Sequence, residues 1–165
     1  MNLVTALAIV IGVLGAVATW LFLGPGAALG LQIWVAFVAW ASFFHCGGGE
    51  AGLKASLPAN IWGALMGTVA LILVGQVGGG VVGAAVIVGV TVFVLIIAAH
   101  VPLLSSIPAG VYGYACAAGY GLLFAGAMPM GVALGSGVFT TVGLSLIVGA
   151  VFGYVSGKIA GAIAK

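Results

Sequence analysis

Apolar residues follow one another in long runs along this chain, and polar positions gather in the short breaks between the runs. Each run is about 20 residues long, which is the length that an α-helix needs to cross the hydrocarbon core of a bilayer. The breaks are rich in Gly or Pro, which punctuate helices. The pattern therefore predicts an all-α membrane protein, a single transmembrane domain over residues 1–165 with six transmembrane helices, at about 3–23, 28–46, 57–76, 81–99, 107–127 and 136–157.

A short motif recurs at even intervals along the chain. The pattern Ser/Thr-x-x-Ala-x-x-x-Gly begins at Thr5, at Ser56 and at Ser106, so that its copies start about 50 residues apart. That period is two membrane spans long. The sequence therefore predicts that the six helices form three repeated two-helix hairpins, over about residues 1–50, 51–100 and 101–165.

Each motif is expected to begin a helix and to pack it tightly. Its hydroxyl residue is expected to cap the helix, with Pro58 or Pro108 in the first turn of the second and third copies. Its Ala and Gly stand four residues apart on one face, where small side chains let two helix backbones approach closely. The same pattern continues along the last span at Gly149, Gly153, Gly157 and Gly161.

Two aromatic residues, Trp62 and Tyr112, directly precede the Gly of the second and third copies. Neighbouring residues on a helix are rotated by about 100°, so the aromatic side chain does not share the small face. The pattern leaves three directions open for it: the bundle centre, the lipid, or the membrane interface.

Asn60 is the one carboxamide well inside a predicted span, and it shares a helix face with Ser56. A buried amide needs a partner, which is either a neighbouring helix or a solute or water in a pore. If three hairpins enclose a common axis, the residues expected to line the passage are Trp62, Tyr112, Asn60, Ser56, Ser106 and Thr5.

Four ionisable residues are candidates for gating or for coupling to protons. His45 and His100 end the second and fourth spans, and an imidazole titrates near neutral pH. Glu50 and Lys54 stand four residues apart, in the favourable order for an ion pair on a helix. The alternatives are solvated helix ends for the two imidazoles and an exposed loop pair for the two charges.

Composition removes several classes of function. Hydrophobic residues make up 65% of the chain and charged residues 2%, whereas soluble domains carry about 25% charged residues. Because Arg and Asp are absent, no nucleic-acid partner is expected. The sequence has no hydrolase-like nucleophile and base, no phosphate-binding loop and no metal-ligand pattern, so neither an enzyme nor a cofactor is expected. Cys46 and Cys116 form no CxxC motif and are expected to be small buried residues.

The few charges indicate an orientation. Lys54 lies between the second and third spans, and Lys158 and Lys165 follow the sixth. Cytoplasmic segments carry an excess of Lys and Arg, so both termini are expected in the cytoplasm. No basic segment precedes the first span, which is therefore expected to be a mature membrane span and not a signal peptide.

The chain resembles a known family over nearly its whole length, and the resemblance is clearest in the stretches GGGEAGLKASL, IPAGVYGYA and FGYVSG. They resemble the YcdZ-type family of small bacterial inner-membrane proteins of unknown function. This resemblance implies a bacterial inner-membrane location and supplies no activity. Three two-helix hairpins around a centre are also similar in architecture to the acid-gated urea channel and amide channel family, although none of that family's motifs is present.

Together these observations predict a membrane channel or facilitator for a small neutral polar solute such as urea, a short amide or ammonia. A passage without fixed charges rejects ions, because it cannot replace their hydration shells. One alternative is a secondary transporter in which Glu50 or a His carries the coupled proton. The other is a structural or regulatory membrane subunit that transports nothing. The expected partners are the lipid bilayer, the solute and further copies of the chain, since small residues favour homo-oligomers.

Overall fold

Six α-helices make up the part of the chain that this computed structural model describes, residues 1–164. They are α1 (Leu3–Leu23), α2 (Ile33–His45), α3 (Gly49–Val77), α4 (Gly80–Ile97), α5 (Ile107–Leu123) and α6 (Val138–Ile163). Short 3-10 turns lie between them at Ala27–Leu29 (η1), Ala98–His100 (η2) and Pro102–Leu104 (η3). The prediction of an all-helical protein with six helices is confirmed.

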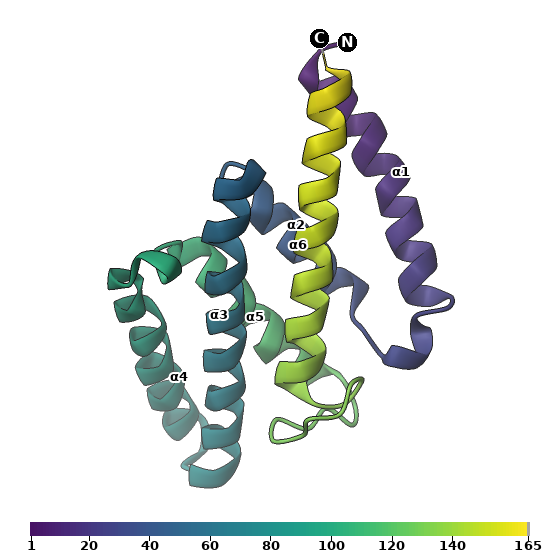
Figure 1. The fold of residues 1–165 in the computed structure, drawn as a ribbon. Coiled ribbons are helices and arrows are strands. Elements are labelled where there is room, and N and C mark those ends of the chain that lie inside the picture. Colours follow the sequence, from purple (N-terminus) through teal and green to yellow (C-terminus); the bar gives the residue numbers. More distant parts are fainter. Residues whose placement is uncertain (165) are drawn as a thin grey trace.

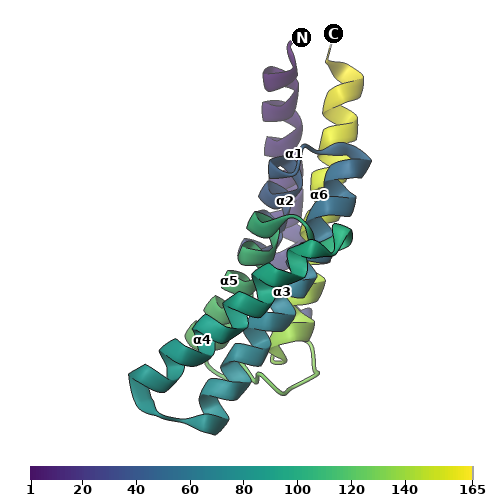
Figure 2. The ribbon, with the colours of Figure 1, turned by 90° about the vertical axis from the view of Figure 1, so that its left-hand side faces the viewer.

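Four helices form the centre of the bundle, and two lie outside it (Figure 1). The central contacts are those of α3 with α5 and of α2 with α6, and α3 also contacts α6. The outer helix α1 lies against α6, and α4 lies against α3 on the opposite side, as the view turned by 90° also shows (Figure 2). Both outer helices expose large apolar side chains, such as Trp20 and Phe93, which is typical of surfaces that contact lipid.

The helices differ in length more than the hydropathy pattern predicts. Four of those within residues 1–164 are long and apolar enough to cross a membrane: α1, α3, α4 together with η2, and α6. By contrast, α2 has 13 residues and α5 has 17, which correspond to about 20 Å and 26 Å of helix. The remainder of the second and fifth predicted spans is loop, with the 3-10 turn η1 at the start of the second.

The short helices α2 and α5 each adjoin a loop, and both loops are held against the rest of the bundle by packing and hydrogen bonds. Gly30 in the α1–α2 loop packs directly against Gly135 in the α5–α6 loop, and both have positive φ angles, 65° and 81°. The backbone N–H of Gln32 donates to Ser145 Oγ on α6 at 2.9 Å. The Tyr120 hydroxyl on α5 donates to the Gly135 carbonyl oxygen at 2.7 Å. These bonds satisfy polar backbone groups that a bilayer could not satisfy.

The structure corrects the predicted helix starts. Helix α3 begins at Gly49, because the turn that separates it from α2 needs only the glycines at 47 and 48, so Ser56 and Pro58 lie inside the helix. Asn2, and not Thr5, caps α1: its Oδ1 accepts a hydrogen bond from the Thr5 N–H at 2.8 Å. Only Ser106 stands at a helix start as predicted, with Pro108 in the first turn of α5, although its side chain makes no capping bond.

The second and third copies of the motif pack against each other along the parallel helices α3 and α5. A methyl group added at Gly63 would overlap the Gly110 carbonyl oxygen, and one added at Gly113 would overlap the Asn60 carbonyl oxygen. Residues 60 and 110, and 63 and 113, are the same positions in the two copies, so the contact is reciprocal. The predicted close approach of small faces is confirmed for these two copies.

The first copy of the motif packs differently. A methyl group at Gly12 would meet nothing within 4 Å, and Thr5 is exposed on α1. The structure therefore has one reciprocal pair of motifs at its centre, and the prediction of three equivalent hairpins around an axis stays a prediction. The α3–α5 contact occupies the middle of the bundle.

The glycine-rich face of α6 packs closely against α2 over only part of the length of α6. Gly149 lies against the backbone of Ala36 on α2, and Gly153 lies against the ring of Phe43. Further along, Trp40 Nε1 donates to Ser156 Oγ at 2.9 Å, which joins the same two helices through a buried bond. Close packing was also predicted at Gly161, and this was wrong, since nothing lies within 4 Å of a methyl group there.

Candidate functional site

Polar side chains at the C-terminal end of α2 contact residues of α3 and residues at the start of α5. Ser42, His45 and Cys46 are three and four residues apart, so they lie on one face of α2. Their partners belong to the second and third motif copies. We call the whole group the polar cluster; its members are Ser42, His45, Cys46, Ser56, Asn60, Ser106 and Tyr112.

Three side-chain contacts hold the polar cluster together. The Ser42 hydroxyl donates to Asn60 Oδ1 at 3.1 Å. Cys46 Sγ lies 3.1 Å from Ser106 Oγ. His45 Nδ1 lies 2.8 Å from the Tyr112 hydroxyl. Through these contacts α2 bridges the first halves of α3 and α5.

The polar cluster runs from the surface of the protein into its interior. His45 is exposed, and the Cys46, Ser106 and Tyr112 side chains are half-buried. Ser42, Ser56 and Asn60 are fully buried, each with 0% of its surface exposed. Asn60 lies about 16 Å along α3 from its start. The inner end of the cluster is therefore buried inside the helical bundle.

Two buried polar atoms at this inner end have no hydrogen-bond partner: Ser56 Oγ and Asn60 Nδ2. Each such group costs about 1–3 kcal/mol of desolvation when it is left unpaired. Ser56 and Asn60 are one helical turn apart on α3, so both atoms belong to the same region. The polar cluster contains no Asp, Glu, Lys or Arg side chain. Its inner end thus holds an amide N–H group and a hydroxyl that have no partner among the described residues.

Five of the ten residues predicted for the site lie in this cluster, and five do not. Those in the cluster are Ser56, Asn60, Ser106, Tyr112 and His45. Trp62 is directed at α4 instead, where its Nε1 donates to the Leu95 carbonyl oxygen at 3.3 Å. Thr5 is exposed on α1. Glu50 and Lys54 are both exposed near the start of α3 and do not reach the polar cluster.

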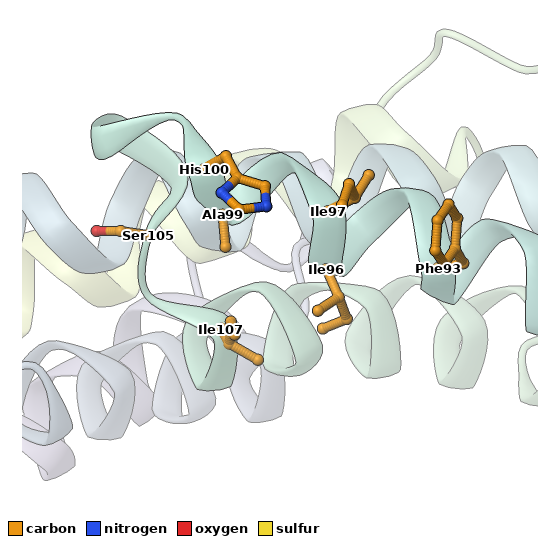
Figure 3. Close-up of a pocket in the computed structure, with 7 residues that line it drawn as sticks. All are labelled: Phe93, Ile96, Ile97, Ala99, His100, Ser105 and Ile107. Carbon is orange, nitrogen blue, oxygen red and sulfur yellow. The ribbon is translucent and has the colours of Figure 1, made fainter.

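His100 belongs to a separate groove of about 420 Å³ between the end of α4 and the start of α5 (Figure 3). Its walls are mainly apolar, from Phe93, Ile96 and Ile97 on α4 and Ile107 on α5. The two histidines thus lie at different places in the fold, since His45 contacts Tyr112 and His100 does not join the polar cluster.

Sequence reasoning missed Ser42 and undervalued Cys46. Ser42 is the one hydroxyl residue within α2, and it stands three residues before His45 on the same face. That spacing is a signal that the sequence contains. What the sequence does not contain is the pairing of α2 with both α3 and α5, which makes Ser42 the partner of Asn60.

Comparison with known proteins identifies the family. The family described as "Protein of unknown function (DUF1097)" matches residues 8–161, which is nearly the full length of the chain. No curated protein and no solved structure matches. The matched region holds the polar cluster and the whole central bundle. This chain, an all-helical protein with membrane-type helices, therefore belongs to the DUF1097 family of proteins of unknown function.

Proposed function

We propose that this protein is a membrane channel or facilitator for a small neutral polar solute, such as urea, a short amide or ammonia, and that the solute passes by the polar cluster. The observation that carries the proposal is the pair of groups without a partner among the described residues, Ser56 Oγ and Asn60 Nδ2, both buried in the first half of α3. A solute that binds both groups offsets the free energy that their desolvation costs.

The chemistry of the cluster supports a neutral solute. Ser42 already occupies the Asn60 carbonyl oxygen, so the amide N–H groups face a solute as hydrogen-bond donors. A carbonyl oxygen, or the nitrogen of ammonia, accepts such a bond. An ion gains no opposite charge here and loses its hydration shell, so it is rejected. The route differs from a passage along a central axis, because the α3–α5 contact fills the middle of the bundle.

The test is solute flux into vesicles that contain the purified chain, followed by stopped-flow light scattering with urea, acetamide and glycerol. Ser56→Ala removes an unpartnered hydroxyl and breaks no hydrogen bond within the protein. Loss of one bond to the solute is expected to reduce flux about five- to tenfold. The matched control is Thr68→Val on the same helix, where the lost hydroxyl is bonded within α3 to the Ala64 carbonyl oxygen at 2.8 Å. Flux through this variant is expected to be unchanged.

Three outcomes would contradict the proposal. If vesicles with the wild-type chain pass no solute faster than empty vesicles, the protein is a structural or regulatory subunit. If flux requires a pH gradient, the protein is a proton-coupled transporter, and His45 at the mouth of the cluster is the residue to test. If Ser56→Ala and Thr68→Val reduce flux equally, the solute does not pass by the polar cluster.

We also propose that both termini face the cytoplasm of a bacterial inner membrane. Both termini lie at one end of the bundle, and Lys158 is near that end (Figure 1). An excess of Lys favours the cytoplasmic side. A fluorescent protein that folds only in the cytoplasm, fused after residue 165, is expected to be bright, and a periplasmic alkaline phosphatase fused at the same place is expected to be inactive. The opposite pattern would overturn this orientation.

A further inference from the structure

A second groove, of about 420 Å³, is lined by residues near the start of α1 and the end of α6. Figure 1 shows that these two helix ends lie together. The groove is bounded by α1, by α6 and by the turn between α2 and α3. The polar cluster contributes no residue to it. Its lining consists of Leu3, Leu7, Phe44, Gly47, Gly48, Gly49, Tyr154, Gly157, Lys158 and Gly161.

One side of this groove is positively charged. Lys158 is the charged residue of the lining, and its Nζ lies 5.3 Å from the centre of the Tyr154 ring. A cation–π contact at this distance holds the ammonium group near the groove. The lone acidic residue of the chain, Glu50, follows the lining residue Gly49, is exposed on the first turn of α3, and is not part of the lining.

The rest of the groove suits an amphiphile. Leu3, Leu7 and Phe44 give it apolar walls. Gly47 and Gly48 form the turn, and their positive φ angles, 91° and 68°, are conformations that favour glycine. With no side chains on this turn, a headgroup can approach the backbone closely. A soluble anion would gain nothing from the apolar walls, whereas a lipid uses the walls and the charge together.

We propose that this groove binds an anionic phospholipid of the surrounding membrane, with the lipid phosphate beside Lys158 and an acyl chain against the apolar residues of α1. The argument is charge complementarity: a single cation in the lining of an otherwise uncharged groove with apolar walls matches the single phosphate of a lipid that also carries acyl chains. The groove is separate from the polar cluster, so this inference does not depend on the proposed function.

The first test compares two lysine variants. The purified full-length chain is taken from vesicles of phosphatidylcholine and phosphatidylglycerol, and the lipids that it retains are identified by native mass spectrometry. Lys158→Gln is expected to reduce retained phosphatidylglycerol about fivefold. Lys54→Gln removes the same charge from an exposed position outside the groove and is expected to have no effect. Equal loss in both variants, or no loss in either, would overturn the proposal.

The second test blocks the groove and leaves Lys158 in place. Gly161 lines the groove within α6, and a Cβ atom added there meets nothing within 4 Å, so Gly161→Leu is expected to place a bulky side chain in the groove. Its control is Gly89→Leu, at an equally open helical position on α4. Only Gly161→Leu is expected to lose phosphatidylglycerol. Unchanged retention in Gly161→Leu, or displacement of the lipid by excess inorganic phosphate, would contradict a lipid site.

Discussion

Substitution of Gly63 by Ala is expected to force α3 and α5 apart and to destabilise the protein by about 3 kcal/mol. The added methyl group would overlap the Gly110 carbonyl oxygen and would lie 2.8 Å from the Tyr114 backbone nitrogen. Both obstacles are backbone atoms, which cannot move aside as the end of a flexible side chain can. Relief requires a shift of a whole helix, and the α3–α5 contact is the most extensive in the bundle.

Two comparisons make this prediction specific. Gly75→Ala is the same substitution on the same helix, where the methyl group meets nothing within 4 Å. Alanine has a helix propensity about 1 kcal/mol more favourable than glycine, so this variant is expected to be as stable as the wild type or more so. Gly113→Ala is expected to cost as much as Gly63→Ala, because its methyl group would meet the Asn60 carbonyl oxygen in the reciprocal contact.

These free energies of unfolding can be measured on the detergent-solubilised chain. The chain is unfolded with increasing fractions of sodium dodecyl sulfate, and the loss of helix is followed by circular dichroism. The prediction fails if Gly63→Ala and Gly75→Ala unfold at the same midpoint. A large difference between Gly63→Ala and Gly113→Ala would show that the contact is not reciprocal in energy.

Gly149→Ala is expected to weaken the second central contact, that of α2 with α6, also by about 3 kcal/mol. A methyl group there would lie 2.6 Å from the carbonyl carbon of Ala36. The same helix provides the control: Gly161→Ala is open and is expected to be neutral. Because Trp40 on α2 is bonded to Ser156 on α6, its fluorescence reports separation of these helices.

The tryptophan signal should be read in a variant that keeps Trp40 and carries Phe at the three other tryptophans. In that background Gly149→Ala is expected to shift the emission at lower detergent fraction than Gly161→Ala does. Coincident transitions for the two variants would mean that α2 and α6 tolerate a wider spacing than the structure indicates.

Hydropathy predicted the number and order of the helices because each span is a long apolar run. It missed the short α2 and α5, since residues of the adjoining loops are also apolar and are held in place by bonds such as that of Gln32 with Ser145. It placed the start of α3 late, because Pro58 is typical of a first helical turn and the run before it is polar enough to resemble a loop. In the structure that run is the beginning of the helix.

Part of the candidate site could be predicted from the sequence, because the helical periodicity of the motif shows which residues share a face. Ser56 and Asn60 were found together for this reason. Periodicity does not identify the neighbour of that face. Trp62 is directed at α4 and Tyr112 at α2, although they occupy equivalent positions in their copies. Thr5 matches the motif on α1, where a methyl group added at the motif glycine, Gly12, would meet nothing within 4 Å among residues 1–164.

The close backbone contacts at Gly63, Gly113 and Gly149 also limit how the bundle can move. Moving α3 and α5 apart would break the most extensive contact in the bundle, and Asn60 lies within that contact. If a solute passes beside Asn60, as we propose, the route is expected to widen mainly through rotation of side chains such as Tyr112. The largest solute that passes is then expected to be set by the fixed spacing of the two helices, with a sharp cut-off in molecular size that changes little with temperature.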